Sequence, residues 1–243
     1  MNTIAPPPQI KKLPPGKRVI GIVLGIAGAG VANVAIGYAG FSLWTRGTKF
    51  VPYDTSDPDL KSATFTKHNP GSNPPSCIDH AVKTIPLDKL KTTDQAQLTR
   101  DFCRGVWSGA GYSFQRRFLE KKYRALPGRE QDLWDRKELA ESEYPVGTKI
   151  TDHFEVVEHT PEKVIVRCGD SPSVVDHRPS DGLFAMEVTK DEENKTATFH
   201  LKSVFVDTTP EGKNGAPQPA AIQLAHRLYT KLWMETATRK LLK

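Results

Sequence analysis

The chain is poor in cysteine and lacks the short motifs of the common hydrolases, metalloproteases and nucleotide-binding enzymes. Its three cysteines, Cys77, Cys103 and Cys168, form no C-x-x-C pair and no Cys/His set with zinc spacing. At most one disulfide is possible, which excludes a disulfide-stapled fold. No G-x-S-x-G, H-E-x-x-H or P-loop sequence is present. We therefore expect no metal site, no cofactor and a binding role more than a catalytic one.

Acidic residues are absent from the first 53 positions, and Val19 to Thr45 contains no charge of either sign. About 20 apolar residues in a helix span a bilayer, so residues 19–44 are predicted to form a single transmembrane helix after a basic, proline-rich tail, 1–18. Four basic residues precede the helix: Lys11, Lys12, Lys17 and Arg18. Without them, 30 basic residues remain against 28 acidic ones. The net charge of +6 is thus mainly a topology signal, and we exclude a nucleic-acid partner.

Two other interpretations of this apolar run compete with the membrane helix. A cleaved signal peptide has an apolar core of only about 7–15 residues, which is shorter than this run. A dinucleotide-binding loop is suggested by Gly28-Ala29-Gly30, but Asn33 stands at the third glycine position and no acidic residue follows before Asp54. Both alternatives are therefore weaker than a membrane helix.

Small residues recur at every fourth position of this helix: Gly21, Gly25, Ala29, Asn33 and Gly37. Such a stripe lets two membrane helices approach closely, and predicts a homo-oligomer; the alternative is that glycine is simply common in membrane helices. The basic flank favours an N-terminus in the cytoplasm or the mitochondrial matrix. The chain is thus expected in the mitochondrial inner membrane or the endoplasmic reticulum, where Asn194-Lys195-Thr196 would be a glycosylation sequon.

Residues 45–77 are rich in proline, serine and aspartate and predict an extended spacer. The globular domain is expected over 78–243. Alternating and 3.6-residue patterns predict strands at 80–86, 154–158, 163–168, 184–188 and 196–208, and helices at 88–107, 112–123, 129–142 and 220–242. The last helix is predicted to bury a stripe made of Ile222, Ala225, Leu228, Leu232 and Trp233. This order predicts an α+β fold with an antiparallel sheet and a long C-terminal helix.

The element order, together with Tyr144-Pro145-Val146-Gly147 ahead of Phe154-Glu155-Val156-Val157-Glu158, resembles the START-like, helix-grip superfamily of pollen-allergen, polyketide-cyclase and lipid-transfer proteins. An unrelated α+β sheet domain is the alternative. The resemblance implies a curved sheet that grips the last helix and encloses an apolar cavity for a lipid or another hydrophobic small molecule. It implies ligand contacts from Phe184, Met186, Phe199, Leu201, Tyr229 and Trp233.

Candidate chemistry is sparse. His177 is the best acid–base candidate because Asp170, Asp176 and Asp181 surround it, although an ordinary polar turn explains the same residues. Arg167 is expected to face solvent. In the 112–123 helix, Phe114, Phe118 and Leu119 are predicted to share one face beside many basic residues, as in a surface helix or one that docks on anionic lipid.

Three functions remain open. The first is a membrane-anchored binding or transfer module for a hydrophobic small molecule. The second is an interaction or assembly subunit of a membrane complex, and the third is an enzyme that acts on a hydrophobic substrate.

Overall fold

The computed structural model describes residues 33–243, of which 33–44 are helical. The predicted membrane span at 19–44 therefore lies mostly outside the described residues, as do Gly21, Gly25 and Ala29 of the small-residue stripe. Within residues 33–243, no helix has the length and apolar character needed to cross a membrane. The chain divides into two compact units, Met1–Arg46 and Gly47–Lys243, and the second is described below.

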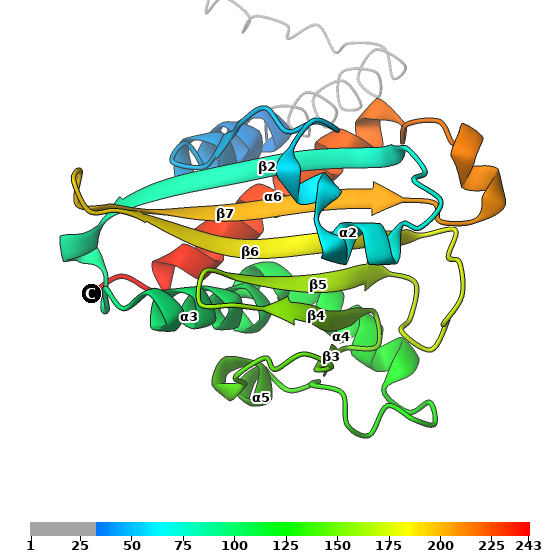
Figure 1. The fold of residues 1–243 in the computed structure, drawn as a ribbon. Coiled ribbons are helices and arrows are strands. Elements are labelled where there is room, and N and C mark those ends of the chain that lie inside the picture. Colours follow the sequence, from blue (N-terminus) through cyan, green and yellow to red (C-terminus); the bar gives the residue numbers. More distant parts are fainter. Residues whose placement is uncertain (1–32) are drawn as a thin grey trace, which may run out of the picture. The chain divides into compact units, whose positions relative to one another are not determined.

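A seven-stranded antiparallel sheet forms the centre of this unit, with the order β1-β2-β7-β6-β5-β4-β3 (Figure 1). Its strands are β1 Lys49–Phe50, β2 Pro75–Pro86, β3 Lys149–Ile150, β4 Phe154–His159, β5 Lys163–Gly169, β6 Asp181–Asp191 and β7 Thr196–Val206. The predicted α+β class and antiparallel sheet are confirmed. The sequence missed β1 and β3 because a two-residue strand has no detectable period.

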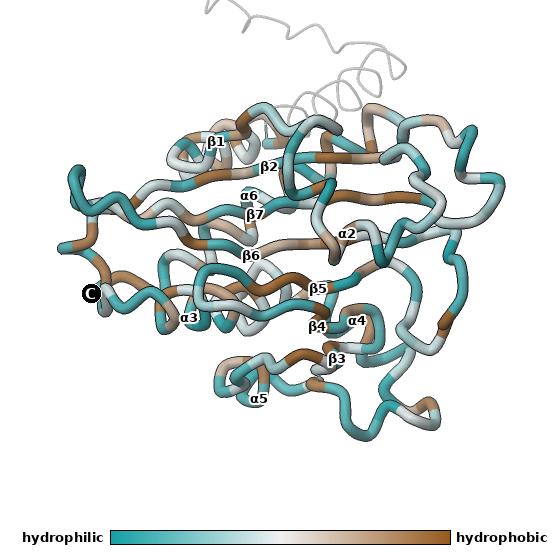
Figure 2. The backbone as a smooth tube through the Cα atoms, in the orientation of Figure 1, coloured by the Kyte–Doolittle hydropathy of each residue, from teal (hydrophilic) through white to brown (hydrophobic). Residues whose placement is uncertain are grey.

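Strands β3 to β7 form a meander, and β7 then pairs with β2, which comes much earlier in the chain. Thr196 pairs with both Asp191 of β6 and Pro86 of β2. Alternation along β7 sends Ala197, Phe199 and Leu201 to one face of the sheet, and all three are fully buried. Figure 2 shows the apolar stretches that this burial requires along β2, β5 and β7.

Four helices lie on that same face, which we call the inner face (Figure 1). They are α3 Gln95–Ser108, α4 Ala110–Tyr123, α5 Arg136–Glu141 and α6 Ala220–Arg239, and short 3-10 helices η2 Leu87–Lys89 and η3 Pro210–Asn214 join them to the strands. Asp94 begins α3 by accepting a hydrogen bond from the Gln97 backbone N–H at 2.8 Å. A Cβ on Gly105 of α3 would lie 2.8 Å from the Ala237 carbonyl oxygen of α6, so glycine permits this close helix crossing.

The buried side of α6 differs from the predicted stripe. Trp233 is buried as predicted, but Ile222 is 52% exposed, and Thr230, Met234 and Ala237 are buried instead. The apolar stripe was misplaced because the buried side also contains polar residues. Thr230 donates to the His226 carbonyl of α6 itself, and buried Glu235 pairs with Lys83 of β2, which a hydropathy pattern cannot reveal.

The predicted spacer at 45–77 is instead largely part of the folded unit. Its residues 49–68 include β1, a 3-10 helix η1 (Pro58–Lys61) and α2 (Ala63–His68). Leu60 packs with Val204 and Val206 on the face of the sheet opposite the helices, which we call the outer face. Tyr53 and Phe65 join this small second cluster. Proline, serine and aspartate, which suggested an extended chain, here form turns and caps, as Asp57 does for η1.

Candidate functional site

The inner face of the sheet has a packed end and a hollow end. At the packed end, Met186, Phe199 and Leu201 are fully buried, and the ring centroid of Phe199 lies 5.1 Å from that of Phe102 on α3. These contacts are typical of a close-packed core. Three of the six residues predicted to contact ligand therefore fill the core.

At the hollow end, a cavity of about 250 Å³ lies between the sheet and the middle of α6. Its lining residues are Gln115, His153, Phe154, Cys168, Gly169, Phe184, Ser203, Phe205, His226, Tyr229, Thr230 and Trp233. Phe184, Tyr229 and Trp233 among them were predicted to contact ligand. The volume lies just below the roughly 300–1,000 Å³ typical of small-molecule pockets.

Aromatic rings form the floor of this cavity. The Trp233 ring on α6 meets Phe184 edge-on with centroids 5.4 Å apart, and meets Tyr229 at 5.1 Å. Trp107 of α3 stands behind Trp233 at 5.6 Å and links the cavity wall to the packed end. Edge-to-face contacts of this kind fix ring orientation, so the wall is shaped before any ligand arrives.

Polar atoms in this wall lack partners. Among the described residues, the Ser203 hydroxyl, the Tyr229 hydroxyl and the Trp233 indole N–H are buried and make no hydrogen bond. Burial raises the pKa of Tyr229, and the neighbouring Trp233 partly offsets this rise, although the two groups do not reach hydrogen-bond geometry. A buried polar group without a partner costs about 1–3 kcal/mol. These atoms are therefore well placed for a bound molecule or water to satisfy.

The titratable groups of the cavity favour neutral forms. Burial raises the pKa of the Cys168 thiol to about 12 and lowers the pKa of His153 below its usual range, although Asp152 partly offsets the latter. No lysine, arginine, aspartate or glutamate is among the described lining residues. The cavity thus suits an apolar molecule with one or two hydrogen-bonding groups.

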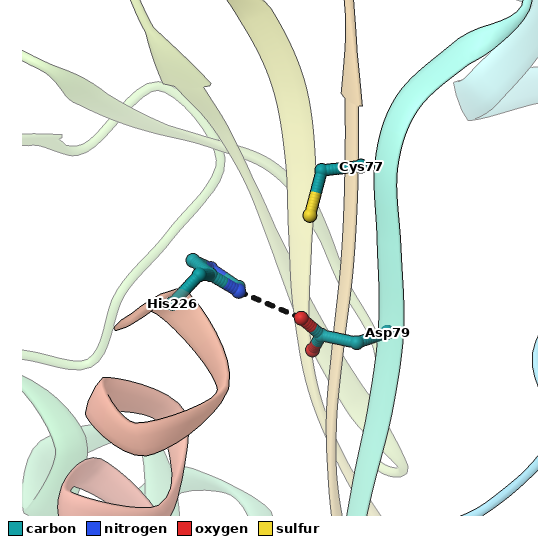
Figure 3. A group of neighbouring side chains, drawn as sticks. All are labelled: Cys77, Asp79 and His226. Atoms are coloured by element: carbon teal, nitrogen blue, oxygen red, sulfur yellow. Dashed lines mark hydrogen bonds and ion pairs between the residues drawn. The ribbon is translucent and has the colours of Figure 1, made fainter. Parts of the chain in front are cut away.

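One charged partner lies directly behind the lining. His226 Nδ1 and Asp79 Oδ2 of β2 are 2.6 Å apart (Figure 3). The Asp79 side chain is only 1% exposed, and Cys77 lies two residues before it on the same face of β2. No local sequence pattern indicates this group, because Asp79 and His226 are 147 residues apart along the chain.

The other residues considered from the sequence lie elsewhere. His177 is in an exposed loop, beside a surface hollow that also includes Lys67 and His68. Arg167 does project from the outer face, but its guanidinium pairs with buried Asp181 at 2.5 Å. The environment of His177 corresponds to the ordinary polar turn, and none of the described residues that line the cavity also lines the hollow beside His177.

The chain matches no protein-family model, no curated protein and no solved structure.

Proposed function

We propose that this protein is a membrane-anchored module that binds an apolar small molecule or lipid in the cavity beneath α6. The observation that carries the proposal is this cavity of about 250 Å³, with aromatic walls and unpartnered polar atoms in its described lining. Apolar walls supply affinity through burial, and a few polar atoms fix orientation. The membrane span at 19–44 would hold the module near its lipid source.

The architecture supports the resemblance to helix-grip proteins. Seven antiparallel strands and a long C-terminal helix are present, and seven is the usual strand number in that superfamily. The proposed cavity lies where that resemblance places the ligand, between the sheet and the last helix.

The test uses the full chain purified in a mild detergent. Organic extracts are compared by mass spectrometry for wild type and Ser203→Leu, and binding of the fluorescent probe anilinonaphthalene sulfonate is titrated against both. Leucine at position 203 would occupy the cavity and remove the unpartnered hydroxyl. We expect a co-purified apolar molecule with wild type, and at least a tenfold weaker binding of the probe by the variant.

Thr198→Leu is the matched control. Thr198 lies on the same strand as Ser203 but on the outer face, where its hydroxyl contacts that of Thr84. Tyr229→Phe is a milder second variant that keeps the shape of the cavity. Equal probe binding by Ser203→Leu and wild type, with both folded by circular dichroism, would contradict the proposal, as would a wild type free of any bound molecule.

A second observation favours contact with lipid outside the cavity. On α4, Phe114 is 82% exposed and Phe118 is 58% exposed, and exposed Arg117, Lys121 and Lys122 lie beside them. Leu119 instead points into the core, which corrects the predicted shared face. Exposed aromatic rings flanked by cations are typical of a helix that rests on anionic headgroups.

A photo-crosslinking amino acid at position 118, in cells or in native membranes, separates lipid docking from the alternative role in a membrane complex. We expect lipid adducts at position 118 and none at position 175, which lies on a loop and is even more exposed, at 86%. A single stoichiometric protein adduct at 118 would favour the assembly role instead.

A further inference from the structure

Three potential metal ligands meet between β2 and α6. The Cys77 thiol, a carboxylate oxygen of Asp79 and a ring nitrogen of His226 all lie within 4.8 Å of one another (Figure 3). Cys77 and Asp79 share the inner face because they are two residues apart on β2, and His226 approaches from the first half of α6. We propose that these residues form a binding site for a divalent zinc-class cation at the wall of the cavity.

The donor set fits such an ion. Zinc in proteins is bound by thiolate, imidazole and carboxylate groups, and sites with three protein ligands keep a fourth position for water. Thiolate and imidazole select against magnesium and calcium, which prefer oxygen ligands. Ser203 is the register partner of Asp79 on β7, so its hydroxyl lies beside the site and is placed to bond a metal-bound water.

Asp79 supplies an independent indication that a partner belongs here. Its side chain is 1% exposed, and its Oδ1 has no hydrogen-bond partner within residues 33–243. The Ser203 hydroxyl is also buried and has no hydrogen-bond partner among the described residues. A buried carboxylate with one oxygen unsatisfied is costly, whereas an ordinary aspartate–histidine pair needs neither the adjacent thiol nor the free oxygen.

The distances require only small movements. Tetrahedral zinc with ligands at about 2.0 Å separates a nitrogen and an oxygen ligand by about 3.3 Å. His226 Nδ1 and Asp79 Oδ2 are 2.6 Å apart around a shared proton, so replacing that proton by the metal widens the pair by less than about 1 Å. The His226 side chain is 24% exposed and provides an entry path from solvent.

Charge also balances in the loaded site. Binding releases the thiol proton of Cys77 to solvent. The proton at Nδ1 of His226 moves to Nε2 when the ring carries one proton, and is released to solvent when the ring carries two. One thiolate and one carboxylate then neutralise the two positive charges of the ion, and the imidazole binds in its neutral form. A buried cluster with zero net charge avoids the desolvation cost of an isolated ion.

Cobalt(II) tests the site because a thiolate bound to cobalt gives a near-ultraviolet charge-transfer band. The full chain in detergent, without a histidine tag, is stripped with a chelator and titrated with cobalt and then with zinc. We expect one cobalt per chain, a thiolate band, loss of the band on zinc addition, and a higher melting temperature with zinc.

Cys77→Ser should abolish the band, and Asp79→Asn and His226→Gln should weaken metal binding by about 100-fold or more. Matched controls are Cys103→Ser, a cysteine buried elsewhere in the core, and His80→Gln, which removes the contact of His80 with His200 on the outer face. Both controls should keep the band. Absence of one-to-one binding in wild type overturns the proposal, and so does a band that survives Cys77→Ser. His226→Gln retains all three thiols, so it decides the question even if the cysteine variant fails to fold.

Discussion

The two faces of the sheet are held by different forces. On the inner face, helices cover large apolar side chains, and the described core there is dominated by residues such as Phe102, Phe199 and Met234. On the outer face, the segment 49–68 covers only a small apolar cluster, and ion pairs and histidines fill the remaining area. The inner face should therefore respond to changes of volume, and the outer face to changes of charge and pH.

Asp181→Ala should have one of the largest effects on the outer face. Asp181 accepts hydrogen bonds from Arg167 at 2.9 and 2.5 Å, and Arg178, which is 1% exposed, lies 4.0 Å away. Removing the carboxylate leaves buried Arg178 and partly buried Arg167 without their counter-charge, and should lower the free energy of unfolding by about 3–5 kcal/mol. Urea denaturation measures this. Exposed Asp176→Ala is the control, expected within about 0.5 kcal/mol of wild type.

Phe199→Ala should have a comparable effect on the inner face, with a loss of about 3–5 kcal/mol in the free energy of unfolding. Phe205 lies on the same strand and the same face, but it is half-buried beside the cavity. Phe205→Ala should therefore cost less than half as much, because fewer packing contacts are lost. Equal losses in urea denaturation would show that the two ends of the inner face are packed alike.

A moderate effect of pH on the stability of the fold is expected, and it comes from histidines that burial keeps neutral. On the outer face, burial, with His200 and Lys202 nearby, lowers the pKa of His80 to about 4. The unfolded chain, with a histidine pKa near 6.5, then binds a proton that the folded chain does not. Stability is thus complete above about pH 6.5 and falls as the pH drops towards 4.

Thermal melts at pH 7 and pH 5 measure this slope. His80→Gln should reduce it, although His68, whose pKa burial also lowers to about 4, should retain part of it. Tyr112→Phe, at the core of the inner face, should leave the slope unchanged because burial raises the pKa of Tyr112 far above this range. An unaltered slope in His80→Gln would show that the histidine pair does not contribute to the pH dependence of stability.

The smallest effect is expected at the exposed aromatic residues of α4, which neither face of the sheet covers. Phe114→Ser should change the free energy of unfolding by no more than about 0.5 kcal/mol, since the side chain is 82% exposed. A loss above 1 kcal/mol in urea would mean that Phe114 packs on protein and would remove the reason to assign it to lipid.

The same contrast explains which parts of the fold could be predicted from sequence. The five long strands were found because alternation between an apolar and a polar face has a clear period, and it placed Met186, Phe199 and Leu201 correctly on one face. The outer cover was missed because Tyr53, Leu60 and Phe65 have no period, and the prolines between them suggested an unfolded segment. A segment that buries only a few irregularly spaced apolar residues has no periodic pattern in its sequence.

The site could be predicted only in part. Alternation gives the face of a residue but not its position along the sheet, so it cannot separate Phe184 at the cavity from Met186 in the core. The group formed by Cys77, Asp79 and His226 left no local signal, since its members come from opposite ends of the domain. Only the long-range pairing of β2 and the packing of α6 bring them together.

The pairing of β2 with β7 also affects the order in which the parts of the domain can fold during synthesis. His80 of β2 contacts His200 of β7, 120 residues later. At ribosomal speeds of about 5–20 residues per second, β2 would wait roughly 6 to 24 s for its partner strand, and longer for α6. During this interval Cys77 and Asp79 would be accessible to solvent. The hollow end of the domain therefore stays open to solvent until residues 226–233 of α6 have been synthesised and have packed on the sheet.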